Sequence, residues 1–269
     1  RGGTGDDEAE QAEGRAYVQA EALRQIRAGA AFLDVNVDEV SYKLDIQKTC
    51  MRWLVGAVQE VSTVPLSIDS SNPEIIKTGL AAYTSAAGRP MINSVALERL
   101  DTIKLVTENN GRVIVTAAGE SGMPDNAEER VENIDQLMVH IQDAGIPLGD
   151  VYIDCLAFPI GVASQYGNDY LDAVSTIREQ YGPEVHITGG VSNVSFGLPK
   201  RRLVNDVFLH LAIESGLDSG IIDPIPASIQ KVLDLDLDSE PVELAMDMLK
   251  GNDDYCMNYI KAFRDGRLD

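Results

Sequence analysis

The feature that most constrains the fold of this chain is the alternation of short apolar runs with longer segments of helical spacing. Seven runs, each short and rich in β-branched residues, cover residues 31–37, 64–71, 90–96, 112–118, 150–157, 184–192 and 219–225. Strands that are buried on both faces of a parallel sheet have this composition. Between the runs, apolar residues recur on one helical stripe, as at Leu171, Val174 and Ile177. The alternation predicts an α/β fold with parallel strands.

The number of runs leaves two architectures open. An open doubly wound sheet can hold seven strands, whereas a (β/α)8 TIM barrel needs eight. The chain begins with Arg1 and not with Met, so a first strand lost upstream would complete a barrel. We therefore expect a (β/α)8 barrel that lacks its first strand in this chain. Residues 1–269 show no evident linker and are predicted to form a single domain, with the Gly-rich, acidic residues 1–10 as a mobile loop.

Composition limits the classes of partner. The formal net charge of −21 argues against nucleic acid and against anionic membranes, and no apolar run is long enough to predict a membrane span. Cys50, Cys155 and Cys256 lie far apart without a CxxC pair, which predicts reduced thiols in a cytoplasmic protein. The three histidines have no metal-ligand spacing, so no metal site is expected.

Polar residues stand at or just beyond the C-terminal ends of successive runs. They are Asn36, Asp69, Asn93, Thr116, Asp154, Asn193 and Asp223. Taken singly, each would be a helix cap or a turn residue. In a barrel, however, these strand ends converge on one mouth, where active sites lie. Seven such residues in phase favour a shared site.

The residue types of this set point to a particular kind of ligand. They are mostly carboxylates and amides, with no Cys, His or Lys, so a nucleophilic triad is not supported. Asp69 and Asp154 are either a general acid/base pair, as in glycosidases, or fixed acceptors for a ligand rich in N–H donors. The second interpretation agrees with Asn93 and Asn193, because amides both donate and accept hydrogen bonds. A flat heterocycle with an amino-pyrimidine edge matches this set.

The stretch EVHITGGVSNVSFGLPKRR, residues 184–202, places two glycines, a serine and an asparagine where a buried strand ends. A flexible turn would explain these residues. Close approach of the backbone to a ligand would explain them as well, since glycine has no Cβ atom.

Five segments carry a resemblance to a known family. In chain order they read FLDVNV, LSIDSSNPEIIKTGL, MINSVALER, YIDCLAFP and GGVSNVSFGLP…RLVNDVFL. Together they resemble the methyltetrahydrofolate:corrinoid methyltransferases, which include the folate module of cobalamin-dependent methionine synthase. The resemblance runs from about Ala20 to Arg264 and implies a (β/α)8 barrel. One departure is Asp38, which stands where the family commonly has Gly.

The resemblance also implies which residues form the site. The cofactor-binding residues would be Asp69, Asn93, Asp154, Gly190, Ser192, Asn193 and Arg201. Asn193 would contact N5 of the folate, and Asp154 would connect N5 to a source of protons. These two residues are the implied catalytic pair.

The implied activity is transfer of a methyl group between N5 of methyltetrahydrofolate and the cobalt of a corrinoid, in one-carbon metabolism. No DxHxxG motif occurs, so the corrinoid (cobalamin) would arrive on a separate protein. The family tends to form dimers, which implies a homodimer. The direction of transfer stays open.

Two other functions remain. A dihydropteroate synthase-like enzyme would share the fold and the pterin pocket, but it needs a diphosphate site where this chain reads VSNVSF. A non-catalytic folate-binding subunit would bind folate without turnover.

Overall fold

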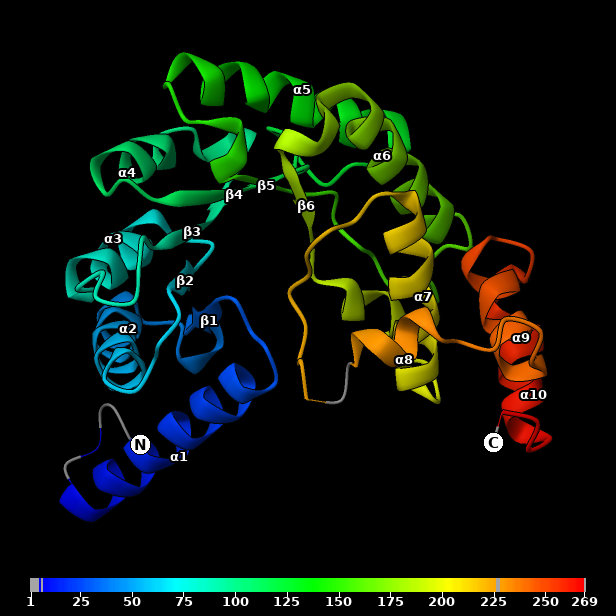
Figure 1. Ribbon diagram of the computed structural model, residues 1–269, viewed down its shortest axis with the longest axis horizontal. Coiled ribbons are helices and arrows are strands. Elements are labelled where there is room, and N and C mark those ends of the chain that lie inside the picture. The colour runs from blue at the N-terminus through cyan, green and yellow to red at the C-terminus, as the bar shows by residue number, and fades with distance from the viewer. Residues whose placement is uncertain (1–4, 6, 226–227, 269) are drawn as a thin grey trace. The chain divides into compact units, whose positions relative to one another are not determined.

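The computed structural model describes residues 5, 7–225 and 228–268, in which six strands alternate with helices along the chain (Figure 1). The described residues divide into two compact units. Unit 1 comprises residues 1–115 and 140–151, and unit 2 comprises residues 116–139 and 152–269. The parallel α/β organisation expected from the sequence is confirmed.

Unit 1 contains parallel strands that pair in chain order. The strands are β1 (Leu33–Asn36), β2 (Leu66–Asp69), β3 (Met91–Val95) and β4 (Arg112–Thr116, whose last residue falls in unit 2). Its helices are α1 (Glu8–Arg27), α2 (Leu44–Gln59), α3 (Pro73–Ala82) and α4 (Thr102–Glu108), with 3-10 turns η1 (Asp38–Val40), η2 (Leu97–Arg99) and η3 (Leu148–Asp150). The register places Asp69 opposite both Asn36 and Asn93, so β1 and β2 end level with Asn93, and β3 continues to Val95.

Helix α3 shows how local sequence determines where a helix begins and how packing determines its distance from a strand. Its N-cap is Asn72, whose side chain accepts a hydrogen bond from the backbone N–H of Glu74 at 2.9 Å, and Pro73 is its first residue. Both assignments were expected from the sequence and are confirmed. Helix α3 packs closely on β2 at Gly79, where a Cβ atom would lie 2.5 Å from Cγ2 of Ile68.

Unit 2 contains the parallel pair β5 (Val151–Asp154) and β6 (His186–Thr188), in which Asp154 lies opposite Thr188. The first residue of β5 and the last turn of α5 fall in unit 1. The helices are α5 (Ala127–Asp143), α6 (Tyr166–Tyr181), α7 (Arg201–Ser215), α8 (Ile229–Leu233), α9 (Glu240–Leu249) and α10 (Met257–Arg264), with 3-10 turns η4 (Gly182–Glu184), η5 (Val191–Ser195) and η6 (Asp254–Cys256). Helices α6 and α7 pack together through the buried rings of Tyr170 and Phe208, whose centroids are 5.1 Å apart.

The seventh predicted strand is absent, which corrects the sequence-based assignment of residues 219–225. The segment starts beside β6, because Ser219 and Ile221 donate backbone hydrogen bonds to Ile187 and Gly189 at 3.1 and 2.9 Å. The carboxylate of Asp223 then accepts from the backbone N–H of Ile225 at 3.0 Å, and Pro224 has no N–H to donate. The chain therefore turns away before a ladder of strand hydrogen bonds forms.

The N-terminal segment also differs from expectation. Glu8, Ala9 and Glu10 belong to α1, and the side chain of Asp7 caps this helix by accepting from the backbone N–H groups of Ala9 and Glu10. The predicted mobile loop over residues 1–10 is therefore wrong for residues 8–10, while residues 1–4 and 6 lie outside the described residues. The assignment of residues 1–269 to a single domain stays a prediction.

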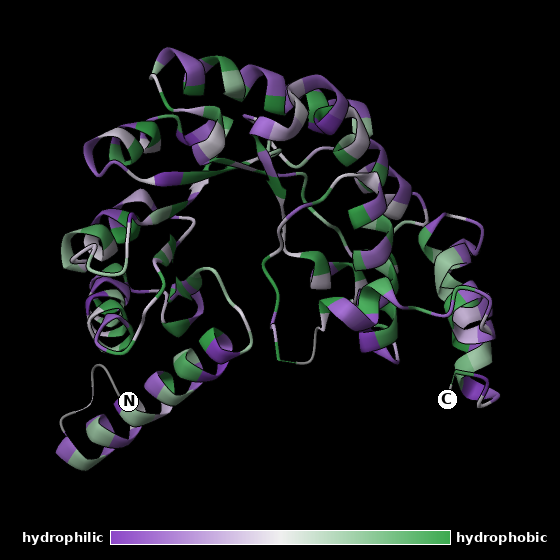
Figure 2. Cartoon of the chain, in the orientation of Figure 1, coloured by the Kyte–Doolittle hydropathy of each residue, from purple (hydrophilic) through white to green (hydrophobic). Residues whose placement is uncertain are grey.

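The hydropathy of the residues differs between the strands and the helices (Figure 2). Apolar residues are concentrated in the strands, and the helices carry mixed apolar and polar faces. Among the described residues, no helix combines the length and the apolar composition needed to cross a membrane.

Candidate functional site

In unit 1, polar side chains gather at the C-terminal ends of β1, β2 and β3. Strand β1 alternates strictly, with Leu33 and Val35 buried and Asp34 and Asn36 exposed. Residues two apart in a strand share a face, so Asp34 and Asn36 project together.

Hydrogen bonds join these side chains. The amide of Asn36 donates to Oδ2 of Asp69 at 2.8 Å, and the amide of Asn93 donates to Oδ1 of Asp34 at 3.3 Å. The structure thus brings together Asn36, Asp69 and Asn93 within unit 1, and it adds Asp34, which the sequence-based selection missed. The alternation in β1 was the signal that could have found Asp34.

The two carboxyl groups of this cluster hold protons more tightly than usual. Burial raises the pKa of Asp69 to about 7, and Coulomb repulsion from Asp34 adds to the effect. Although part of the Asp34 side chain is exposed, the protein around its carboxyl group removes water from it, and this desolvation raises the pKa of Asp34 as well. Near neutral pH, the pair is therefore able to offer both an ionised acceptor and a protonated donor, beside two amides.

Asp38 stabilises the loops that follow β1 and β2. Its carboxylate accepts from the Ser70 hydroxyl at 2.6 Å, and from the backbone N–H and hydroxyl of Ser71 at 2.8 and 2.9 Å. This side chain has a structural role that the glycine common in the resembled family cannot supply.

In unit 2, Asp154 ends β5. Its Oδ1 atom accepts from the backbone N–H of Leu156 at 2.8 Å. Burial raises the pKa of Asp154 to about 6. The carboxyl group therefore changes protonation close to neutral pH, which is the range useful for proton transfer.

Asn193 lies in η5, the 3-10 turn that follows Gly189 and Gly190. Its backbone N–H donates to the carbonyl of Gly190 at 3.0 Å. A Cβ atom on Gly190 would lie 3.0 Å from Nδ2 of Asn193, so glycine at this position leaves room for the amide side chain. The glycines that the sequence associated with ligand approach also make room for side chains of the protein itself.

Arg201 begins α7 and is held by the same turn. Its guanidinium donates to the Ser195 hydroxyl at 3.0 Å and to the Ser192 carbonyl at 3.1 Å, and it lies 4.5 Å from the centre of the Phe196 ring. A pocket of about 250 Å³ adjoins this arrangement. It is lined by Val191, Ser192, Arg201, Arg202, Asn205, Asp206, Leu209, Ile222 and Asp223.

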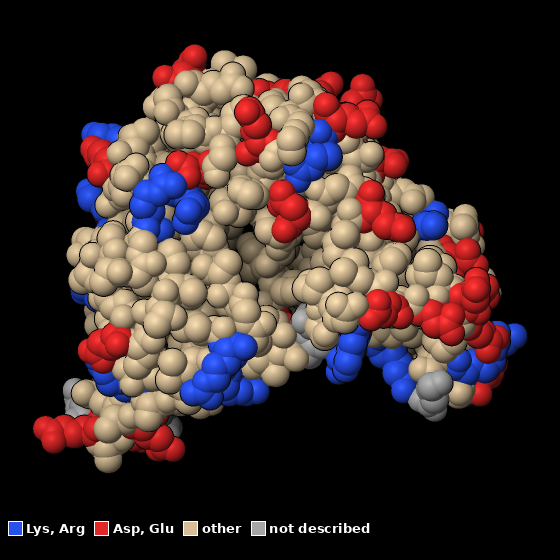
Figure 3. Space-filling model, in the orientation of Figure 1, with Lys and Arg blue, Asp and Glu red and all other residues tan. Residues whose placement is uncertain are grey.

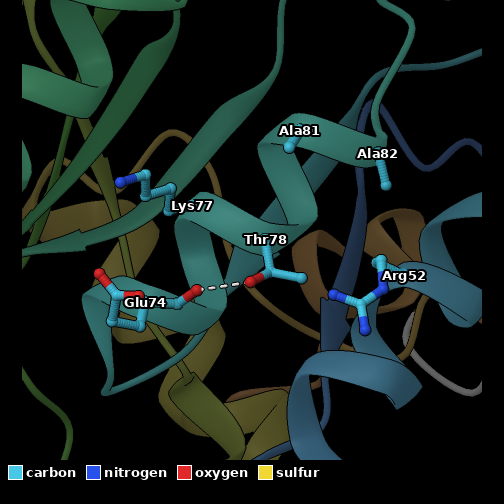
Figure 4. Close-up of a pocket in the computed structure, with 6 residues that line it drawn as sticks. All are labelled: Arg52, Glu74, Lys77, Thr78, Ala81 and Ala82. Atoms are coloured by element: carbon cyan, nitrogen blue, oxygen red, sulfur yellow. Dashed lines mark hydrogen bonds between the residues drawn. The ribbon is translucent and has the colours of Figure 1, made fainter. Parts of the chain in front are cut away.

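A second pocket, of about 300 Å³, lies between α2 and α3 in unit 1 (Figure 4). Arg52 comes from α2, and the other lining residues, including Glu74, Lys77 and Thr78, come from α3. The Thr78 hydroxyl donates to the Glu74 carbonyl at 2.7 Å. None of the predicted site residues lines this pocket, so it is separate from the candidate site.

Acidic side chains are spread over the face drawn in Figure 3, with basic side chains between them. In the part of the chain that the structure describes, no group of three or more His, Cys, Asp and Glu side chains is arranged to hold a metal ion.

Two curated proteins are similar to the chain over most of its length. The methylcorrinoid:tetrahydrofolate methyltransferase of Eubacterium limosum is 29% identical over 258 residues, which cover 94% of this chain and 89% of the relative. The methionine synthase of Mycobacterium leprae (strain TN) is 34% identical over 216 residues, which cover 75% of this chain and 17% of that longer protein.

Solved structures of dihydropteroate synthases share the fold. The enzyme of Stenotrophomonas maltophilia matches with a TM-score of 0.66 at 18% identity, over 82% of this chain and 86% of that chain. The Xanthomonas albilineans enzyme in complex with 7,8-dihydropteroate matches with a TM-score of 0.62 at 19% identity, over 81% and 82%. At these identities the likeness shows the fold alone, which is the TIM-barrel type expected from the sequence.

The family model for pterin-binding enzymes matches residues 4–223, most of the sequence. This range includes both polar sets described above. The chain belongs to the pterin-binding enzyme family.

Proposed function

We propose that this protein transfers a methyl group between N5 of methyltetrahydrofolate and the cobalt of a corrinoid carried by a separate protein. The observation that carries the proposal is the similarity, over 94% of the chain, to a methylcorrinoid:tetrahydrofolate methyltransferase. The dihydropteroate synthases match at lower identity and support the fold only.

The cluster in unit 1 is proposed to bind the amino-pyrimidine edge of the pterin. Such an edge presents adjacent N–H donors, which suit the paired carboxyl groups of Asp34 and Asp69. The amide of Asn93 is able to donate and accept beside them. Their mutual hydrogen bonds support this role, because a preorganised polar set binds a flat ligand with little loss of side-chain entropy.

The set in unit 2 is proposed to act on N5 and on the rest of the folate. Asn193 and Asp154 would serve as the catalytic pair, and Gly190, Ser192 and Arg201 would contact the folate. An amide cannot supply a proton, but the Asn193 side chain is able to accept a hydrogen bond from a protonated N5 or to donate one to its lone pair. A bond that strengthens as charge develops on N5 lowers the barrier for transfer. Asp154 changes protonation near pH 6 and would exchange the proton with N5 or with solvent.

The corrinoid supplies the cobalt that gives up or accepts the methyl group. The name of the Eubacterium relative puts the corrinoid first, and we propose the same physiological direction, from corrinoid to tetrahydrofolate. We also propose that the protein works as a cytoplasmic homodimer. The three buried cysteines, none of which forms a disulfide, support a reducing compartment.

The test is a methyl-transfer assay with purified protein, followed by the absorbance of the corrinoid. It is run in both directions, with methylcobalamin and tetrahydrofolate in one and with reduced Co(I) cobalamin and methyltetrahydrofolate in the other. Asn193→Ala is expected to lower kcat by about 10²- to 10³-fold, with a much smaller change in folate affinity, because its hydrogen bond matters most in the transition state. Near-normal turnover in this variant would refute the role of Asn193.

Asn168→Ala is the matched control. The Asn168 side chain donates to the carbonyl of Lys250 at 2.7 Å, so its loss tests the structural cost of removing an amide from unit 2. Folate binding without methyl transfer by the wild type would identify a non-catalytic binding subunit. Condensation of p-aminobenzoate with a pterin diphosphate would identify a dihydropteroate synthase.

A further inference from the structure

The peptide bond between Cys155 and Leu156, directly after β5, is held from both sides. Its carbonyl accepts a hydrogen bond from Nε of Arg130 at 3.0 Å, and its N–H donates to Oδ1 of Asp154 at 2.8 Å. Arg130 lies in α5 and Asp154 ends β5, so one planar peptide unit connects two ionisable side chains within unit 2. The orientation of the Asp154 carboxyl group therefore depends on how this peptide unit is held.

Leu156 does not hold the peptide unit by its own conformational preference. Its φ angle is 63°, in the left-handed region that a residue with a Cβ atom adopts only at a cost in energy. Surrounding contacts must offset this cost, and the two hydrogen bonds of the peptide unit are such contacts. Without the bond from Arg130, rotation of the peptide unit would draw the Leu156 N–H away from Asp154.

The guanidinium of Arg130 is itself held in place. The side chain is fully buried, Nη1 donates to the carbonyl of Asn126 at 2.8 Å, and Cζ lies 4.8 Å from the centre of the Phe158 ring. Among the described residues, Nη2 has no hydrogen-bond partner. A buried guanidinium with an unpartnered donor costs stability, so packing alone does not explain an arginine here. A role for its bond to Cys155 would explain it.

The ionisable groups around Asp154 come from α5, from α6 and from the residue that follows β5. They are Arg130, the Tyr170 hydroxyl and the Cys155 thiol, and Asp169 of α6 acts on Arg130. Burial raises the pKa of the thiol and of the hydroxyl, so both stay neutral near pH 7. Burial lowers the pKa of Arg130 and the Asp169 carboxylate opposes this effect, but a guanidinium keeps its charge in proteins. Arg130 is thus the cation of this set.

We propose that Arg130 is a positioning residue for methyl transfer, which holds the Asp154 carboxyl group toward the folate through the peptide bond between Cys155 and Leu156. A charged donor on the carbonyl polarises the peptide unit and makes its N–H a stronger donor to Asp154. This bond favours the ionised carboxylate and opposes the effect of burial. The orientation toward folate rests on the proposed function, whereas the effect on Asp154 does not.

The direct test is the titration of Asp154 in the ligand-free protein, followed by ¹³C NMR of labelled aspartate carboxyl groups and assigned with Asp154→Asn. Arg130→Met removes the donor and fills a similar space. In this variant the midpoint for Asp154 is expected to move upward by about one pH unit, because the ionised form loses a strong hydrogen bond. Arg130→Gln has an amide nitrogen as many bonds from Cα as Nε, so it should bring the midpoint back toward the wild-type value.

Two outcomes would overturn the inference. The first is a folded Arg130→Met protein in which Asp154 titrates as in the wild type. The second is an equal shift in Arg130→Met and Arg130→Gln, because the charge and not the hydrogen bond would then be responsible. If Arg130→Met does not fold, Arg130→Lys takes its place, since it keeps the charge but has a methylene group where Nε stood. An unchanged midpoint in that variant contradicts the inference in the same way.

Arg178→Met is the matched control. Arg178 lies in α6 and also donates to backbone carbonyls of unit 2, through Nε to Gly216 at 3.0 Å and through Nη1 to Gly182 at 2.7 Å. The substitution removes the same kind of carbonyl contact at another place in the unit. The midpoint for Asp154 should therefore not change.

The inference and the proposed function fail separately. A raised midpoint in Arg130→Met, with no methyl transfer by the wild type, would retain the effect of Arg130 on Asp154 and reject the proposed function. Methyl transfer by the wild type with an unchanged midpoint in Arg130→Met would do the reverse. If both hold, the pH profile of kcat in Arg130→Met should move upward together with the Asp154 midpoint.

Discussion

At the scale of single residues, the polar cluster of unit 1 combines features that oppose stability with features that suit a ligand. Asp34 and Asp69 repel each other when both are ionised, and burial adds to the cost of ionisation. Proteins place groups with such perturbed pKa values at functional sites more often than elsewhere. The arrangement therefore supports a binding role and predicts a stability cost.

The pH dependence of stability tests this cost. The pKa of Asp69 rises from 3.8 to about 7 on folding, so its stabilising contribution is complete below pH 3.8 and is lost as the pH rises through 7. Asp69→Asn does not titrate and keeps an oxygen that accepts from Asn36. We expect this variant to be more stable than the wild type at pH 8, by on the order of 1–3 kcal/mol, and to lose folate binding.

Urea unfolding at pH 5 and at pH 8 measures the free energy of unfolding of both proteins and so tests this prediction. The stability difference between Asp69→Asn and the wild type should increase with pH. An equal difference at the two pH values would show that Asp69 has an ordinary pKa in the folded protein.

At the scale of elements, local sequence explains where helices and strands begin, and packing explains how closely they approach. The cap at Asn72 and Pro73 starts α3, whereas Gly79 determines how closely α3 packs on β2. The loop contacts of Asp38 with Ser70 and Ser71 depend on the pairing of β1 with β2. The cap could be read from neighbouring residues, but these packing contacts could not.

Two glycine substitutions separate packing from helix propensity. Gly79→Ala is expected to destabilise the protein by about 1–3 kcal/mol, because the new methyl group would lie 2.5 Å from Cγ2 of Ile68 and 3.2 Å from the Met51 side chain. Gly56→Ala in α2 meets nothing within 4 Å and should stabilise by about 0.4–1 kcal/mol. Chemical denaturation measures the free energy of unfolding of both variants. A Gly79→Ala protein as stable as the wild type would show that α3 is free to move away from β2.

At the scale of the whole molecule, the acidic excess dominates. The net charge of −21 produces self-repulsion that opposes the folded state, and salt screens it. We expect the melting temperature at pH 8 to rise as NaCl increases from about 0.01 to 0.3 M, a range over which the Debye length falls well below 10 Å. At a pH near the sequence pI of about 4.4, the same salt series should have little effect. A flat salt response at pH 8 would contradict the prediction.

The sequence by itself determined the α/β class, the positions of six strands, the start of α3 and the residues that match the pterin-binding family. These features follow from periodicity, capping chemistry and motif order, all of which lie within short stretches of chain. The predicted strand at 219–225 was wrong, because whether that stretch continues pairing with β6 depends on the turn at Asp223 and on Pro224.

Only the tertiary structure decided which side chains meet. It brought Asp34 to Asn93, although β2 lies between their strands, and it placed the Tyr170 hydroxyl and the Asp154 carboxyl close to the position that a Cβ atom of Gly189 would take. Residues far apart in sequence become neighbours through strand order and helix packing, and the pKa values of Asp69 and Asp154 follow from the burial that results. Burial and distance belong to the folded chain, and no local pattern encodes them.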